Sequence, residues 1–314
     1  MISYLEFEKP VANLEERISD LRGADVDHKG DVAAEIKRLE NKSAELLAST
    51  YASLTPWQKT QVARHPARPH FRDYVANAFD EFVPLGGDRY FGDDLAIMGG
   101  FARLNGQRVM LIGHEKGHDT QSRIAHNFGM GKPEGYRKAI RLMEMAGRFG
   151  LPVVTLVDTS GAFPGIEAEE RGQAEAIARS TEACLALPVP MVAVIVGEGG
   201  SGGAVALASA ERVLMMEHAV YSVISPEGCA SILWRTSEKA PEAAEAMKVT
   251  AQHLKRLKVI DRIVKEPVGG AHRDPKAASE ALGKALSEEL TNLSKKSSAE
   301  LIRMREERFL QMGG

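Results

Sequence analysis

From residue 153 onward, short apolar runs alternate with segments of helical length, and this alternation constrains the fold more than any other feature. Residues 153–157, 191–196 and 212–216 are apolar runs of strand length, and 168–187 separates the first two with helical spacing. Strands joined through helices pair in parallel, because a parallel connection needs a long crossover. The sequence therefore predicts an α/β fold with a mostly parallel sheet covered by helices.

The rest of the chain supplies further helices and one strand hairpin. Asn105-Gly106 lies between two strand-like runs, 95–104 and 107–112, and suits a type I′ turn because both central residues need φ > 0. Thr55-Pro56 places a cap residue before a proline, which predicts a helix start. The other predicted helices cover 11–21, 31–50, 71–82, 133–150, 226–235, 245–258 and 275–312, with a break at 23–30, and the other strands cover 220–223 and 259–264.

Composition is that of an ordinary globular chain. The 314 residues are 44% hydrophobic and carry a formal net charge of -3, which gives no reason to expect nucleic acid or an anionic membrane as partner. No apolar run approaches the roughly 20 residues of a membrane span. The acidic start at 1–8 lacks the layout of a signal peptide, and Cys184 and Cys229 lie far apart, so we expect reduced thiols and a cytoplasmic location.

A glycine-rich stretch, 197–204, follows the second apolar run and precedes a helix-like segment. Consecutive glycines let the backbone take φ > 0 and let a ligand approach it closely. The first turn of a helix presents N–H groups without partners and a partial positive charge. This stretch is therefore predicted to be a loop and helix start that binds an anion or stabilises a developing oxyanion.

A second loop, 158–165, follows the preceding strand. Ligands of open α/β folds bind at the carboxyl ends of the strands, where we expect both loops to lie. Two neighbouring loops of backbone donors could hold one oxyanion between them. The alternative is that their glycines only make tight turns, which is less expected for two loops on successive strands than for one.

Two other motifs overlap the glycine-rich stretch. Residues 197–202 fit the dinucleotide fingerprint G-x-G-x-x-G, with Glu217 near the distance of a ribose-binding acid, but the fingerprint normally opens a nucleotide domain and here follows several strands. Residues 199–203 fit G-x-S-x-G around Ser201. They are expected to lie beyond the strand, so a serine nucleophile is not favoured.

Three histidines, His114, His118 and His126, stand near Glu115 and Asp119, which could indicate a metal site. No H-E-x-x-H motif accompanies them, and the segment is polar and flanked by glycines. We therefore expect 113–131 to be a loop that is solvated or contacts an anionic ligand. Its basic residues, with the one that follows it, are Lys116, Arg123 and Lys132.

Longer runs show which family the chain resembles. It is similar over nearly its whole length to the carboxyltransferase alpha subunits of bacterial acetyl-CoA carboxylase, and the run 221–234 makes the resemblance highly specific. The other matching segments are 5–10, 127–130, 133–139, 158–159, 161–165, 169–173, 175–178, 197–204 and 269–273. The resemblance implies a crotonase-like (ClpP/crotonase) spiral of ββα units with helical N- and C-terminal extensions. We expect a helical segment at 1–90, the carboxyltransferase core at 91–265 and a helical tail at 266–314.

The resemblance also implies an assembly. The family's alpha subunit pairs with a zinc-containing beta subunit of similar fold as an α2β2 heterotetramer. Biotin is attached to a separate biotin carboxyl carrier protein, ATP is used by a separate biotin carboxylase, and acetyl-CoA lies mainly on the beta subunit. For this chain we therefore expect no attached biotin and no metal.

The implied reaction moves a carboxyl group from carboxybiotin to acetyl-CoA and gives malonyl-CoA, the first committed step of fatty acid biosynthesis. Charge develops on the biotin ureido oxygen and on the thioester oxygen, and both need preorganised N–H donors. By resemblance, Gly202 and Gly203 donate to the ureido oxygen. The expected substrate-binding residues are Gly161, Ala162, Phe163, Gly199, Gly200, Ser201 and Lys116. The released biotin anion can take the acetyl proton, so no side chain need act as base.

A stand-alone enoyl-CoA hydratase or isomerase of the crotonase type is the alternative, and a scaffold without chemistry is a third interpretation. The hydratase needs a pair of acids in its pocket, for which Glu167, Glu169 and Glu198 are available. The chain departs from relatives at His118 and His126, where basic residues are common, so we expect a weaker or pH-sensitive contact there. The helical terminal segments are expected to bind partners.

Overall fold

The computed structural model describes residues 3–23 and 29–312. Within them, eight strands form one sheet in the order β1-β2-β3-β4-β5-β6-β8, and β7 pairs with β5 outside this path. The strands are β1 (Glu81–Pro84), β2 (Ile97–Leu104), β3 (Gln107–His114), β4 (Val153–Thr159), β5 (Met191–Gly200), β6 (Arg212–Met216), β7 (Val220–Ser222) and β8 (Arg262–Val264). Pairing is antiparallel from β1 to β3 and parallel from β3 onward. The predicted α/β fold with a mostly parallel sheet is confirmed.

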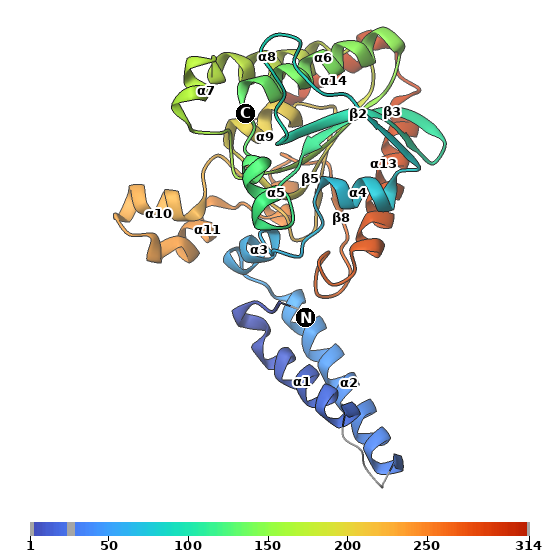
Figure 1. Cartoon of the computed structure of the whole chain (residues 1–314), viewed down its shortest axis with the longest axis vertical. Coiled ribbons are helices and arrows are strands. Elements are labelled where there is room, and N and C mark those ends of the chain that lie inside the picture. Colours follow the sequence, from blue (N-terminus) through green and yellow to red (C-terminus); the bar gives the residue numbers. More distant parts are fainter. Residues whose placement is uncertain (1–2, 24–28, 313–314) are drawn as a thin grey trace.

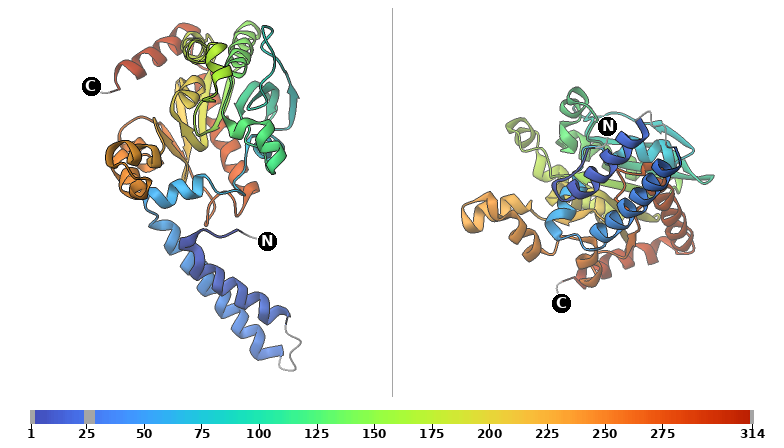
Figure 2. Two further views of the ribbon diagram at one scale, coloured as in Figure 1. Left: turned by 60° about the vertical axis from the view of Figure 1, so that its left-hand side comes forward. Right: turned by 90° about the horizontal axis from the view of Figure 1, so that it is seen from below.

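Helices cover the sheet and extend beyond it (Figure 1). They are α1 (Lys9–Gly23), α2 (Lys29–Ala52), α3 (Pro56–Ala63), α4 (Phe71–Ala78), α5 (Thr120–Ala125), α6 (Pro133–Phe149), α7 (Ile166–Glu170), α8 (Gln173–Ala186), α9 (Ser201–Ala208), α10 (Pro226–Trp234), α11 (Ala240–Met247), α12 (Ala251–Arg256), α13 (Pro275–Leu293) and α14 (Ser298–Leu310), with short 3₁₀ turns η1 (Glu6–Glu8), η2 (Asn127–Gly129) and η3 (Ser237–Lys239). In Figures 1 and 2 the α1–α2 hairpin and the α10–α11 pair project away from the sheet. None of the helices in the described ranges has the length and apolar character of a membrane span.

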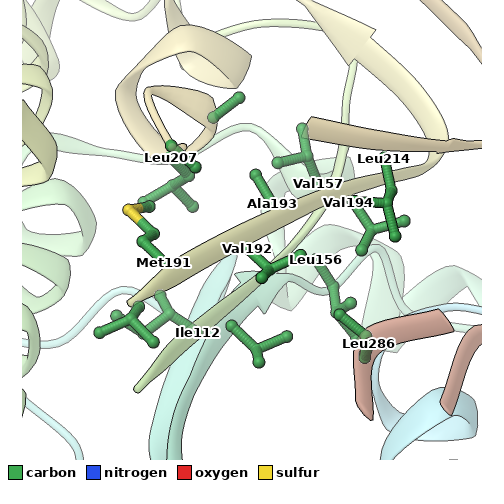
Figure 3. Close-up of a cluster of buried hydrophobic side chains, with 14 of the residues drawn as sticks. Ile112, Leu156, Val157, Met191, Val192, Ala193, Val194, Leu207, Leu214 and Leu286 are labelled. Atoms are coloured by element: carbon green, nitrogen blue, oxygen red, sulfur yellow. The ribbon is translucent and has the colours of Figure 1, made fainter. Parts of the chain in front are cut away.

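The centre of the core is formed by β4 and β5, in which every residue is buried. Figure 3 shows how the two layers of helices meet these strands: Leu207 of α9 lies on one side of the β4–β5 ribbons and Leu286 of α13 on the other. A strand buried on both faces is apolar without alternation, which explains the continuous runs in the sequence. The carboxyl ends of β4 and β5 therefore emerge directly from the buried core.

Several predicted local features are confirmed. Asn105 (φ 48°) and Gly106 (φ 79°) form the left-handed turn between β2 and β3. The Thr55 side chain accepts from the Gln58 amide at the start of α3, as expected of a cap residue. The helical hairpin is confirmed too, with α1 ending at Gly23 and α2 beginning at Lys29; the predicted break between them lies largely outside the described residues.

Other predicted boundaries are wrong, and backbone conformation gives the reason. The helix predicted over 71–82 ends at Ala78, because 81–84 pair with β2 as strand β1. Gly172, with φ 80°, divides the helix predicted over 168–187. Lys248, with φ 57°, divides the one predicted over 245–258, and the tail 275–312 is two helices. The predicted loop 113–131 contains α5 and η2.

Candidate functional site

The glycine-rich stretch forms the end of β5 and the start of α9. The prediction of a loop is wrong for its first half, because residues 198–200 are extended and pair with β7. The predicted helix start is confirmed at Ser201, whose φ of 51° is left-handed. The sequence predicts that the motif G-x-S-x-G lies beyond the strand, which argues against a nucleophile elbow. That prediction is wrong, because β5 ends at Gly200 and α9 begins at Ser201. A serine nucleophile also needs a neighbouring base. Among the described residues, the Ser201 hydroxyl makes no hydrogen bond to a basic side chain, so a serine nucleophile is still not favoured.

The two predicted loops touch each other through glycine backbone. A Cβ built on Gly200 would lie 2.2 Å from the Ser160 carbonyl oxygen, and one on Gly203 would lie 2.8 Å from the Gly161 carbonyl carbon and 2.9 Å from the Ala162 nitrogen. Only residues without a Cβ allow this approach. The expectation that both loops lie together at the carboxyl ends of neighbouring strands is confirmed.

The first turn of α9 offers backbone donors beside this contact. Gly200 is the N-cap and its residue type supplies no capping side chain. The amides of the first helical turn have no partner within the helix, so those of Gly202 and Gly203 can donate to an anion. Gly203 is buried and Gly202 is half-buried. A Cβ on Gly202 would only meet the Ile177 side chain at 3.5 Å, an ordinary contact.

A cavity of about 240 Å³ opens beside Ser160 and Glu198, at the ends of the two strands. Other side chains that line it are Arg64, His70, Lys116, Arg123 and Phe128. Three of these carry permanent positive charge, and Phe128 adds an aromatic face. The cavity thus suits a small anionic or strongly polar group next to the backbone-donor loops.

Two ion-pair groups organise the charges around the cavity. Arg64 bridges Glu198 and Glu227 at 2.6 Å each. Lys116 is positioned in the cavity, and its Nζ lies 2.6 Å from Asp158 Oδ1. Burial alone would raise the pKa of the Asp158 carboxyl, but the Lys116 ammonium and the His70 ring outweigh burial and lower it.

Sequence reasoning missed Arg64 and Asp158. Asp158 had a signal, since a charged residue directly ends the apolar run 153–157. A carboxylate at the end of a buried strand must find partners there. Arg64 had none, because its partners Glu198 and Glu227 are distant in sequence.

Phe163 and the three acids considered for a hydratase, Glu167, Glu169 and Glu198, do not share one pocket. The Phe163 ring is 4.7 Å from the Lys132 ammonium, and that lysine lies 3.6 Å from Glu167. Glu198 lines the cavity but is held by Arg64, and Glu169 is exposed on α7.

The histidines predicted near the site make separate contacts. His118 is exposed, with Nε2 3.5 Å from Asp73, and His126 Nδ1 lies 2.6 Å from the Ser122 carbonyl oxygen. His114 is fully buried, and burial lowers its pKa to about 3. Among the described residues no three histidine, cysteine or acidic side chains gather as metal ligands would.

Solved structures with low sequence identity share the fold of this chain. The chain resembles transcarboxylase 12S with a TM-score of 0.60 and 19% identity, covering 73% of this chain and 42% of that chain. It resembles the beta subunit of P. aeruginosa geranyl-CoA carboxylase with a TM-score of 0.56 and 19% identity, covering 78% of this chain and 47% of that chain. It thus spans less than half the length of either. The fold is that of the crotonase-like carboxyltransferases.

Sequence comparison gives the family. Residues 4–313 match the family model described as acetyl co-enzyme A carboxylase carboxyltransferase-like. The chain is 78% identical over 314 residues to the acetyl-coenzyme A carboxylase carboxyl transferase subunit alpha of Erythrobacter litoralis, covering 100% of both. The corresponding subunit of Rhizorhabdus wittichii is 69% identical over 313 residues, with 100% of both covered. The chain belongs to this family of carboxyltransferase alpha subunits, and membership implies a beta subunit as partner.

Proposed function

We propose that this chain works with a beta subunit to transfer the carboxyl group of carboxybiotin to acetyl-CoA, giving malonyl-CoA. The observation that carries the proposal is the contact between the 158–165 loop and the first turn of α9, which brings Gly203 against Gly161 and Ala162. Carboxyl transfer needs donors aimed at developing oxyanions in a site that excludes water. Family membership supports the same reaction.

In this proposal the chain contributes backbone rather than acid–base side chains. The amides of Gly202 and Gly203 donate to the developing oxyanion, and losing such a donor typically costs about a hundred- to a thousandfold in rate. The loop that includes Gly161, Ala162 and Phe163 forms the facing wall. Lys116 and Arg123 are basic residues that line the neighbouring cavity, and the Lys116 charge is paired with Asp158. Carboxybiotin, presented by its carrier, supplies the carboxyl group.

The remaining site residues have supporting roles in the proposal. Gly199 and Gly200 bring β5 close to Tyr221 and Ser160, because a Cβ on either would lie within 2.8 Å of those residues. Ser201 is exposed at the start of α9, and the proposal gives its hydroxyl no role as a nucleophile.

The finer parts of the assembly are proposals as well. We infer that the beta subunit carries zinc and most of the acetyl-CoA site, that biotin arrives on a separate carrier, and that a separate biotin carboxylase uses ATP. A Pseudomonas malonate decarboxylase solved as a hetero-tetramer with coenzyme A has a similar fold, with a TM-score of 0.57 and 16% identity, covering 68% of this chain and 86% of that chain. The likeness to that hetero-tetramer shows the fold alone. The α2β2 stoichiometry rests on the family resemblance. The cytoplasmic location stays a prediction from composition and cysteine usage.

The reverse reaction tests the function. This chain and its beta partner are mixed with malonyl-CoA and biocytin, and formation of acetyl-CoA is followed, with each chain alone as control. Activity in the mixture only is the expected result. A stable complex without activity would contradict the proposal, and hydration of an enoyl-CoA by the isolated chain would favour the alternative enzyme.

A further inference from the structure

The strands β4 and β5 change register where they reach the site. Val157 lies opposite Ile195, whereas Thr159 lies opposite Gly199. Three residues of β5, 196–198, therefore face the single residue Asp158. Such a bulge removes backbone groups from the ladder and turns the strand in a new direction.

The strand that pairs with the other edge of β5 also changes at this bulge. Before it, residues 192–195 pair with β6, and after it, residues 198–200 pair with β7. The backbone that leads into α9 thus takes its direction from the bulge. Buried backbone groups released by a bulge must find other hydrogen-bond partners.

Two buried charged side chains provide those partners. The Glu198 amide donates to Asp158 Oδ1 at 2.9 Å, and the Val196 carbonyl oxygen accepts from Arg68 Nε at 2.9 Å. The carboxylate fits beside the strand because residue 197 is glycine: a Cβ on Gly197 would lie 2.4 Å from Asp158 Oδ1.

The charge on Asp158 is itself held by fixed neighbours. Its side chain is 1% exposed, with Lys116 Nζ at 2.6 Å and His70 Nδ1 at 3.2 Å. These partners lower the pKa of the carboxyl although burial alone would raise it. A hydrogen bond from an amide to a carboxylate is stronger than one to a neutral acceptor. On the other side, Arg68 is paired with Glu266 at 2.6 Å.

We propose that Asp158 is a positioning residue of the carboxyltransferase site: it fixes the bulge at 196–198 and thereby aims the amides of Gly202 and Gly203. The inference rests on the proposed function for its effect on rate. Asp158 need not touch substrate to act in this way. A small displacement of preorganised donors lowers the rate without weakening substrate binding to the same extent.

The test uses two variants with one matched control. Asp158→Asn removes the charge, and Gly197→Ala pushes the carboxylate aside without removing a charged group. Asp261→Asn is the control, because Asp261 likewise accepts a strand amide, Val213 N at 2.7 Å, and pairs with Arg308 at 2.6 Å, but touches β6 away from the glycine-rich stretch. If Asp158→Asn does not fold, the inference is tested with Gly197→Ala alone.

Two measurements are made on each variant. Hydrogen exchange of the backbone amides of 196–204 in the full chain should become at least about tenfold faster in both variants and stay unchanged in Asp261→Asn. In the complex with the beta subunit, kcat should fall at least about tenfold while KM stays within about twofold. Loss of thermal stability in Asp261→Asn without loss of kcat is also expected.

Unchanged exchange and kcat within about twofold of wild type in both variants would overturn the inference. So would a fall in kcat for Asp261→Asn as large as that for Asp158→Asn, because the effect would then be general destabilisation. Failure of the proposed function is distinguishable, since the wild-type complex would then transfer no carboxyl group while the exchange result at 196–204 still stands.

Discussion

Arg305 shows at the residue scale how single side chains hold this chain together. Its guanidinium is fully buried and pairs with Glu211 at 3.0 Å. It also donates to carbonyl oxygens at the end of α8, including those of Cys184 (2.7 Å) and Leu185 (2.9 Å). The last carbonyls of a helix have no partner within it. One residue of α14 therefore caps α8 and joins the tail to the core.

We predict that Arg305→Met lowers the free energy of unfolding by about 3–5 kcal/mol, because it leaves Glu211 buried without its partner. Urea unfolding measures the change. Arg303→Met on the same helix is the control: its side chain is 68% exposed and lies 3.5 Å from Glu307. The control should change stability by less than about 0.5 kcal/mol. Equal effects of the two substitutions would contradict this account of Arg305.

Residue types predict part of the site, whereas the positions of its other residues depend on contacts between distant parts of the chain. The glycines of 158–165 and 197–204 could be identified as backbone-donor loops, because glycines repeated at the ends of successive strands favour close approach of a ligand to the backbone. The bulge around Asp158 could not be predicted, since its cause includes Lys116 and His70, whose approach depends on the whole fold.

At the scale of elements, the α10–α11 pair differs from the helices at the two ends of the chain. Ile232 is 71% exposed and Leu233 is 64% exposed at the end of α10, which projects from the sheet in Figure 1. In α1 and the described side chains of α2, large apolar residues are buried or half-buried. An exposed apolar cluster indicates an interaction surface. The terminal helices predicted to bind partners have less such surface, apart from Leu310 in α14 (84% exposed).

We therefore expect the double substitution Ile232→Asp with Leu233→Asp to weaken binding of the beta subunit at least about tenfold, because buried charges without partners oppose association. Titration calorimetry of the full chain with the beta subunit measures the affinity. Leu310→Asp should leave it unchanged. The reverse pattern would assign the interface to the C-terminal tail.

Local sequence patterns predict that a helix or strand exists more reliably than they predict where it ends. The pattern over 71–82 is helical as far as Ala78, and pairing with β2 converts 81–84 into a strand. Likewise β5 continues to Gly200 because β7 pairs with residues 198–200. In both places a tertiary contact overrides weak local propensity. The proposed division at 90 and 265 stays a prediction.

At the scale of the whole molecule, the buried His65 and the half-buried His272 join the start of the chain to the segment before α13. The rings of His65 and His272 stack with centroids 3.9 Å apart, and His65 Nε2 lies 2.9 Å from the Ser3 carbonyl oxygen. Burial, helped by nearby positive groups, lowers the pKa of His272 to about 3. Burial likewise lowers the pKa of His218 to about 4.

These shifts predict acid sensitivity. Below the ordinary histidine pKa of about 6.5 the unfolded chain binds protons that the folded chain does not, so the free energy of unfolding falls as pH decreases. The fall should begin at about pH 6.5 and be visible by about pH 5, above the pKa range of most carboxylates. Urea unfolding between about pH 8 and pH 5 measures it, and His272→Gln should reduce the slope. Stability that is constant over this interval would contradict the prediction.

Two variants test whether the two touching backbone loops form the carboxyltransferase site. In the complex with the beta subunit, kcat is measured for Gly203→Ala and Gly202→Ala. A Cβ on Gly203 would displace the Gly161–Ala162 backbone, whereas one on Gly202 has room. We expect kcat to fall about a hundredfold for Gly203→Ala and less than about tenfold for Gly202→Ala. Full activity of an assembled Gly203→Ala complex would contradict this expectation.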